Sequence, residues 1–161
     1  MKLPKPEYKY MRLAIAEARK NLFSPDGGPF GACVVKNNKV IAIARNTVLV
    51  NNDATCHAEV NAIREASRKL KDYYLSGCVI YSTTEPCPMC FSAIHWSKIE
   101  AVYFGTTIND VKKLGFGELR ISCKKMKFIS KSRVKVISGF LAKECVNLLA
   151  DWNRLEKKQV Y

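Results

Sequence analysis

Two short stretches of the sequence carry residue types that bind zinc. His57 lies in the first, and Cys87 and Cys90 form a C-x-x-C pair in the second. One imidazole and two thiolates, with no fourth Cys or His at ligand spacing, match a catalytic zinc site, which leaves one coordination position for water. Glu59 follows the histidine by two residues, and a carboxylate beside such a water can take its proton and pass it on. The spacing therefore predicts hydrolytic chemistry at a zinc ion.

The ligands and the carboxylate together indicate removal of an amino group from a ring. A zinc ion lowers the pKa of its bound water from about 16 to about 7. The water would then attack an amidine-type carbon, C(=N)–NH2. Glu59 would deliver the water's proton to a ring nitrogen and would then protonate the amino group, so that ammonia leaves. H-x-E followed by P-C-x-x-C is the signature of zinc deaminases.

Other interpretations of the same residues explain less. A lone C-x-x-C can be a redox pair or half of a structural zinc site, but a redox pair leaves His57 and Glu59 without a role. A structural site needs four protein ligands. His95 follows Cys90 by five residues and points away from the thiol pair on a helix, so a packing or surface role is expected for it. A structural zinc domain of a nucleic-acid-binding protein is the non-enzymatic alternative.

The composition predicts one globular domain over residues 1–161. A chain of this length with 48% hydrophobic and 25% charged residues fits a single core. No apolar run approaches the ~20 residues that span a bilayer, and the first six residues lack a signal-peptide pattern. The seven cysteines are an odd number, so we expect a cytoplasmic protein with reduced thiols. The net charge of +13 could serve to bind nucleic acid. Alternatively, it reflects a solvated lysine-rich surface, which is favoured because the charge is spread along the chain.

Apolar periodicity predicts alternating helices and strands. Helices are expected over about residues 8–22, 53–69, 87–97 and 140–158, and strands over 30–35, 39–44, 78–82, 101–105 and 134–137. Asp53 or Thr55 is expected to cap the second helix, and Asn37-Asn38 to form a hairpin turn. Residues 47–52 are expected to form a loop and 108–117 a loop or short helix, whereas 120–133 show no regular pattern.

This order of elements predicts a three-layer α/β/α sandwich around a five-stranded mixed sheet. The first two strands are expected to be antiparallel and the later, helix-linked strands parallel. His57 and Glu59 would lie in the first turn of one helix, and both thiols in the first turn of the next. A helix N-terminus favours a thiolate, so the two N-termini can converge on one metal.

The motifs His57-Ala58-Glu59 and Pro86-Cys87-Pro88-Met89-Cys90 resemble those of the cytidine and deoxycytidylate deaminase superfamily. Other stretches are similar to bacterial guanine deaminases: Gly27-Gly28-Pro29-Phe30-Gly31-Ala32, Ala93-Ile94-His95-Trp96, Leu114-Gly115-Phe116-Gly117-Glu118, and the interval from Trp152 to Tyr161. The resemblance covers roughly residues 14–161 and is weakest over 120–135. It implies a cytidine deaminase-like fold.

The resemblance also implies a role for each matching residue. Zinc would be bound by His57, Cys87 and Cys90, with Glu59 as the proton carrier. The purine would be held by Asn46 and Ala58 and walled by Phe30 and Trp96, two residues that are expected in the core in any case. Glu118 stands where the family has an aspartate that helps to move protons, and Tyr161 stands where a C-terminal tyrosine closes the pocket. The helix and tail over 140–161 would cross to a partner subunit and give a domain-swapped homodimer.

Three of these residues have structural alternatives. Asn46 could be a cap at a strand end, Glu118 a solvated loop acid, and Tyr161 an unattached terminus. The substrate therefore depends on residues outside the zinc motifs.

The leading hypothesis is hydrolysis of guanine to xanthine and ammonia. The alternative is conversion of adenosine to inosine in tRNA, supported by the net charge of +13 and by cations that could follow a phosphate backbone: Lys124, Lys125, Lys127, Lys131, Arg133 and Lys135. Two features argue against this alternative. Pro88 stands where the RNA-editing relatives usually carry valine, and those relatives lack a C-terminal tail such as the one from Trp152 to Tyr161. Guanosine and related aminated rings, such as aminopurines, aminotriazines and pterins, suit the same chemistry.

Overall fold

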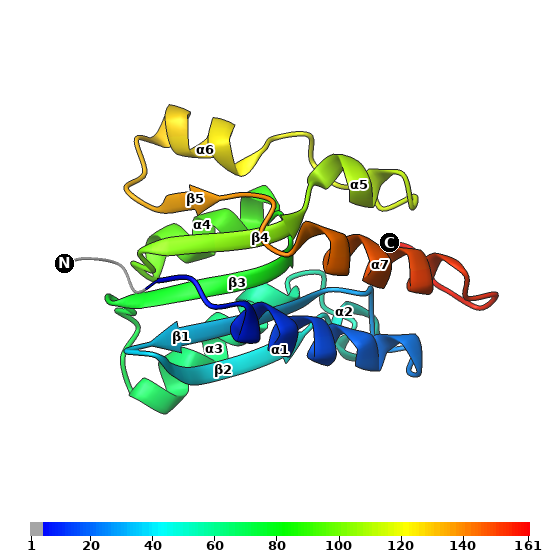
Figure 1. The fold of residues 1–161 in the computed structure, drawn as a ribbon, viewed down its shortest axis with the longest axis horizontal. Coiled ribbons are helices and arrows are strands. Elements are labelled where there is room, and N and C mark those ends of the chain that lie inside the picture. Colours follow the sequence, from blue (N-terminus) through cyan, green and yellow to red (C-terminus); the bar gives the residue numbers. More distant parts are fainter. Residues whose placement is uncertain (1–4) are drawn as a thin grey trace.

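A five-stranded mixed sheet forms the middle layer of the protein (Figure 1). The computed structural model describes residues 5–161, so residues 1–4 of the predicted domain lie outside the described residues. The spatial order of the strands is β2-β1-β3-β4-β5. β1 pairs antiparallel with β2 and β3, whereas β3, β4 and β5 are parallel. The strands are β1 (Gly31–Lys36), β2 (Lys39–Arg45), β3 (Cys78–Thr84), β4 (Ala101–Thr106) and β5 (Lys135–Ile137).

Helices cover both faces of this sheet. The layer on one face is α1 (Tyr8–Arg19), continued by a 3-10 turn (Lys20–Leu22), and α7 (Ala142–Asn153). The layer on the other face is α3 (Ala58–Leu70), α4 (Pro88–Trp96) and α6 (Cys123–Ser130). Two short helices, α2 (Val48–Asn51) and α5 (Ile108–Lys112), lie in connections. The three-layer class expected from the sequence is therefore confirmed.

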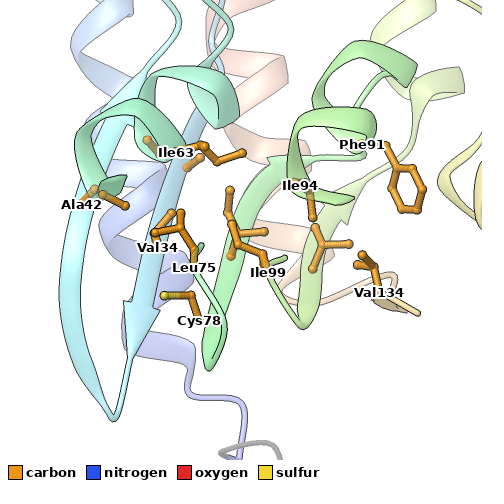
Figure 2. Packing of buried hydrophobic residues seen from close by; sticks show 14 of the residues in the cluster. Val34, Ala42, Ile63, Leu75, Cys78, Phe91, Ile94, Ile99 and Val134 are labelled. Carbon is orange, nitrogen blue, oxygen red and sulfur yellow. The ribbon is translucent and has the colours of Figure 1, made fainter. Parts of the chain in front are cut away.

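The core follows from the alternation of side chains along each buried strand. In β3, Cys78 and Ile80 pack toward α3 and α4, whereas Val79 and Tyr81 pack toward α1 and α7. Figure 2 shows the first of these clusters, where Ile94 of α4 lies with Ile99 and Val134 near the starts of β4 and β5. Within the described residues, no helix has the length and apolar character needed to cross a membrane.

The ends of two helices differ from the sequence expectation. Asp53 and Thr55 do not cap α3; instead the Thr55 backbone N–H and hydroxyl both donate to Asp53 Oδ1 at 2.7 Å. His57 takes the N-cap position. The last helix begins at Ala142 and ends at Asn153, rather than spanning 140–158, and its later start follows from the left-handed conformation of Leu141, with φ of 53°.

Two short helices occur where none was expected. Residues 47–52 contain α2 instead of only a loop. α6 lies within the segment that showed no pattern, and its N-cap Ser122 accepts a hydrogen bond from the Lys125 N–H at 3.2 Å. The expected short helix between residues 108 and 117 is α5.

Candidate active site

Two helix N-termini meet at the end of the sheet where β3 and β4 finish. His57 is the N-cap of α3, and Cys87 is the N-cap of α4 with Pro88 as the first helical residue. Proline suits that position because its missing N–H would have had no helical partner. Cys90 lies one turn into α4 and is fully buried. The predicted convergence of the two helices is thus present in the structure.

The three side chains have the geometry of a zinc site. His57 Nδ1 lies 3.6 Å from Cys87 Sγ and 3.6 Å from Cys90 Sγ, and all three candidate ligand atoms lie within 4.8 Å of one another. Zinc bonds of about 2.0–2.1 Å to nitrogen and about 2.3 Å to sulfur, at a tetrahedral angle, separate N and S by about 3.6 Å. The donor set therefore fits zinc through Nδ1, with one coordination position left for water.

Electrostatics at the thiols support metal binding. The hydrogen bond from Cys90 lowers the pKa of the Cys87 thiol to about 4, with His57 contributing in the same direction against the effect of burial. The same pairing with Cys87, followed by burial, raises the pKa of Cys90. Within the chain alone, one thiolate is thus available near neutral pH, and metal binding deprotonates a coordinating thiol outright.

Glu59 lies against this cluster in a buried position. Its Oε2 accepts from the Cys90 thiol at 3.5 Å, and its Oε1 is 2.9 Å from the Ser82 hydroxyl. Ser82 Oγ is also 2.7 Å from the Thr84 carbonyl oxygen, and its single hydrogen can serve only one acceptor at a time. Burial raises the pKa of Glu59. Ser82 therefore connects the Glu59 carboxyl group to the end of β3.

A small cavity lies in front of the candidate ligands. It has a volume of about 20 Å³ and is lined by Phe30, Asn46, His57, Glu59, Thr84, Glu85, Cys87 and Glu118. Of the residues predicted to contact a purine, Phe30 and Asn46 line the cavity, and so does Glu118. Burial raises the pKa of Glu118 to about 7, with Cys87 acting in the same direction. Ala58 instead packs into the core cluster under the sheet.

Asn46 is held in one orientation by its surroundings. It is 1% exposed, and its Oδ1 accepts from the Val48 N–H at 3.1 Å. Its backbone oxygen accepts from Asn21 Nδ2 at 2.9 Å, and the same Asn21 amide also donates to the Gly28 carbonyl at 2.8 Å. Because the side-chain oxygen is already engaged, the group that Asn46 offers to the cavity is its NH2 donor.

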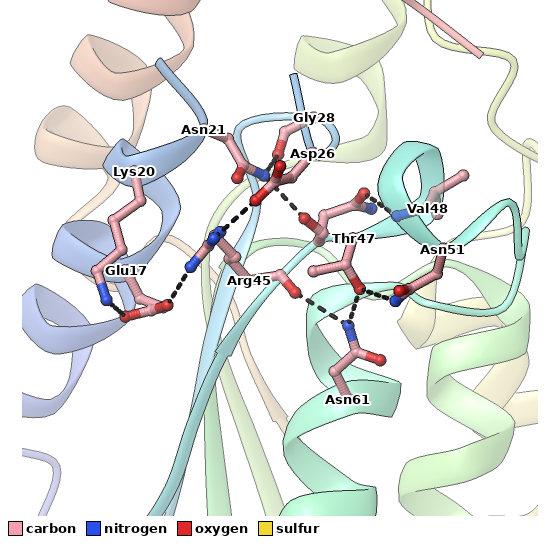
Figure 3. A network of polar contacts seen from close by, with 11 residues as sticks. Glu17, Lys20, Asn21, Asp26, Gly28, Arg45, Thr47, Val48, Asn51 and Asn61 are labelled. Atoms are coloured by element: carbon pink, nitrogen blue, oxygen red, sulfur yellow. Dashed lines mark hydrogen bonds and ion pairs between the residues drawn. The ribbon is translucent and has the colours of Figure 1, made fainter. Parts of the chain in front are cut away.

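A polar network supports this loop from outside (Figure 3). Arg45 donates to Asp26 at 2.7 Å and to Glu17 at 3.0 Å, which ties α1 and the loop before β1 to the end of β2. The hydrogen bond to Arg45 lowers the pKa of Asp26. Gly27 lies so close to Asn46 that an added Cβ would be 2.2 Å from Oδ1 and 2.9 Å from the backbone oxygen. The loop therefore requires glycine there.

The C-terminal residue packs beside the cavity in this chain, although it is not among the residues that line it. The Gly28 N–H donates to the Tyr161 hydroxyl at 3.2 Å, and the Gly117 N–H donates to the Tyr161 carbonyl oxygen at 3.4 Å. The Tyr161 ring meets the Phe116 ring edge-on with centroids 5.5 Å apart, and Phe116 meets Phe30 at 5.0 Å. Tyr161 is therefore connected through Phe116 to Phe30, which lines the cavity.

Trp96 does not occupy the position expected of it. It ends α4, is 72% exposed, and is absent from the residues that line the cavity of the described chain. Its ring contacts His95, with centroids 6.0 Å apart, and the Lys98 ammonium at 5.6 Å from its centroid. The expectation that Trp96 is a core residue is wrong, because the side of α4 that carries it faces solvent.

Sequence reasoning missed Thr84, which lines the cavity, and two further residues at the site, Ser82 and Glu85. Glu85 is buried and uses both oxygens: Oε1 accepts from the Cys123 N–H at 2.9 Å and Oε2 from the Ile108 N–H at 3.3 Å. It thus ties the starts of α5 and α6 to the segment between β3 and Cys87. All three are polar residues at or just beyond the carboxyl end of an otherwise apolar strand, and that position was the available signal.

Comparison with known proteins agrees with this geometry. The family model for the cytidine and deoxycytidylate deaminase zinc-binding region matches residues 4–106, which is more than half of the chain. The chain belongs to this family. It is therefore a deaminase with a zinc-binding region, and the His/Cys/Cys cluster provides the ligands that such a region needs.

The individual relatives include both guanine deaminases and tRNA-specific adenosine deaminases. Guanine deaminase of Bacillus subtilis is 40% identical over 109 residues, covering 68% of this chain and 70% of that protein. The tRNA-specific adenosine deaminase of the same organism is 37% identical over 153 residues, covering 93% and 91%. The solved structure of guanine deaminase from Nitrosomonas europaea superposes with a TM-score of 0.82 at 27% identity, covering 96% of this chain and 88% of that one.

Proposed function

We propose that this deaminase hydrolyses a free purine base, guanine, to xanthine and ammonia. The observation that carries the proposal is the hydrogen bond from the Gly28 N–H to the Tyr161 hydroxyl, which holds the C-terminal residue beside the cavity. A cavity of about 20 Å³ has room for about one water and none for a purine. The tail must therefore open to admit substrate. A lid that closes again over a free base would exclude a polynucleotide.

The side chains around the cavity suit this reaction. His57, Cys87 and Cys90 would hold the zinc ion, which would supply a water nucleophile near neutral pH. Glu59 would carry two protons from that water, the first to a ring nitrogen and the second to the amino group that leaves as ammonia. One water is consumed, and one ammonia is released for each base.

The remaining cavity residues hold the ring. The Asn46 NH2 donates to an acceptor on the purine, and Phe30 packs against the purine face. Glu118 has a pKa near 7, which suits a second proton carrier at neutral pH.

Incubation of the zinc-loaded protein with guanine tests the proposal. Xanthine and ammonia are expected in equal amounts at micromolar enzyme. A screen of guanosine, other aminopurines, aminotriazines and pterins for ammonia release runs in parallel. Absence of xanthine alongside release of ammonia from another ring would reassign the substrate.

A second candidate is deamination of adenosine in tRNA. It is supported by the Bacillus tRNA-specific adenosine deaminase, whose match extends over 93% of this chain, and by the net charge of +13. Mass spectrometry of tRNA treated with the protein decides between the two candidates. Inosine in tRNA without xanthine from guanine would favour the second.

We also propose that the protein is a cytoplasmic homodimer with an exchanged C-terminus. The core residues Cys145 and Leu148 of α7 are buried against the sheet, which favours exchange of the tail after Asn153 rather than of the helix. Light scattering with the full chain and with a chain ending at Asn153 tests this. A monomeric full chain would contradict it.

A further inference from the structure

A groove lies at the end of the sheet opposite the catalytic cavity. It has a volume of about 560 Å³ and is lined by Tyr74, Ser76, His95, Lys98, Ile99, Glu100, Lys131, Arg133, Val134 and Lys135. These residues precede or begin β3, β4 and β5, at the left of Figure 1. The candidate zinc ligands lie beyond the other end of β3. Its seven residues, at about 3.3 Å each, separate the two sites by about 20 Å.

The groove carries a strong excess of positive charge. Four cations line it, namely Lys98, Lys131, Arg133 and Lys135, and all four are exposed. Among the ion pairs formed by residues 5–161, none involves these four. The single acid in the groove is Glu100, and its Oε1 already accepts from the Gly77 N–H at 2.9 Å.

Two of these cations occupy backbone positions that ordinarily select glycine. Lys98 follows the end of α4 with φ of 61°, and Lys131 follows the end of α6 with φ of 53°. A left-handed conformation costs free energy for a residue with a Cβ atom, whereas glycine takes it freely. Both lysines therefore place positive charge in the groove at a conformational cost.

Aromatic rings border the same charges. Tyr74 lines the groove and is about half exposed. Trp96 stands beside it, with its ring against His95 and under the Lys98 ammonium. His95 Nδ1 is 2.9 Å from Ser132 Oγ, which joins the end of α4 to the segment that carries Lys131 and Arg133. Exposed rings interleaved with cations are the features with which proteins hold single-stranded nucleic acids, by stacking bases and neutralising phosphates.

We propose that this groove binds a single-stranded nucleic acid through its phosphate backbone, with Tyr74 and Trp96 stacking on bases. The charges favour this occupant over a second copy of the chain, because a two-fold contact would bring the same four cations face to face. The proposal concerns a surface about 20 Å from the catalytic cavity, so it does not depend on which ring is deaminated.

Fluorescence anisotropy with labelled oligouridine and oligothymidine tests the proposal on the full zinc-loaded chain. Four phosphate contacts predict a slope of about −2.8 for log K against log salt, which is about a fifty-fold loss of affinity between about 50 and about 200 mM salt. Arg133→Gln with Lys135→Gln should reduce the slope to about −1.4. Comparison of the two oligonucleotides distinguishes RNA from DNA.

Matched variants separate the effect of the groove on binding from the effects of total charge and of folding. Lys5→Gln with Lys143→Gln removes the same total charge at exposed positions outside the groove and should leave the slope unchanged. Lys98→Gly with Lys131→Gly should weaken binding while the Tm stays equal or rises, because glycine relieves both left-handed residues.

Three results would overturn the proposal. They are equal losses of affinity in the two glutamine pairs, no oligonucleotide binding at about 50 mM salt, and binding only to anionic vesicles or to an acidic protein.

Discussion

The contact between Tyr161 and the loop before β1 gives a prediction with a defined magnitude. Tyr161→Phe leaves the Gly28 N–H without its acceptor, and a lost hydrogen bond of this kind costs about 1 kcal/mol. Tyr161→Ala also removes the edge contact with Phe116, which contributes about 1 kcal/mol more. At about 1.4 kcal/mol for each factor of ten, kcat/KM should fall about five-fold in the first variant and about thirty-fold in the second.

Steady-state ammonia release from guanine, measured alongside thermal unfolding, provides the assay. Tyr161 is 37% exposed, so the Tm of both variants should stay within a few degrees of wild type. Tyr73, which is 78% exposed, provides the matched control, and Tyr73→Phe and Tyr73→Ala should leave kcat/KM unchanged. A Tyr161→Ala variant within two-fold of wild type would refute the role of the tail as a lid. A loss of activity that is explained by unfolding of the variant would also refute that role.

Three further predictions concern the site and its support. Glu59→Gln should retain one zinc, measured by metal analysis, and lose at least about a hundred-fold in turnover; loss of the metal would contradict the assigned role. Gly27→Ala should lower Tm and raise KM, because the new Cβ would lie 2.2 Å from Asn46 Oδ1; unchanged kinetics would show that Asn46 is not a substrate contact. Arg45 lowers the pKa of Asp26, so this carboxylate stabilises the fold above about pH 4 and the contribution is lost as pH falls through the lowered pKa. Asp26→Asn should therefore reduce Tm by more at pH 7 than at pH values below about 4, and a reduction that does not change with pH would contradict the ion pair.

The sequence predicts those elements whose residue pattern has a single physical cause, such as burial of a strand. Residues 78–82 and 101–105 are apolar runs, and they lie in the buried central strands β3 and β4. The spacing of His57, Cys87 and Cys90 predicts their meeting, because each half of the motif follows a loop and begins a helix. Such signals lie within short segments, so they can be recognised without knowing which residues pack against those segments.

Elements that depend on their neighbours escaped prediction. α6 contains several lysines and has a single fully buried residue, Cys123, so its apolar periodicity is weak. Asp53 and Thr55 have the composition of helix caps, yet they bond to each other in a turn. Leu141 shortens the last helix through a left-handed conformation that leucine seldom adopts.

The site likewise contains residues that can be predicted from local sequence and residues that depend on tertiary contacts. The zinc motif and Glu59 can be found from residue types and spacing, whereas the exposure of Trp96 depends on which side of α4 faces the sheet. Glu85 is a second example, because the N–H groups that it binds come from Ile108 and Cys123, far along the chain. Residues that act through tertiary partners require the structure.

Zinc titration of the metal-free protein tests the central claim most directly. Ammonia release from guanine should be absent without metal, rise in proportion to added zinc and reach a plateau at one zinc per chain. Deaminase activity that persists in protein shown by metal analysis to contain no zinc would contradict the account.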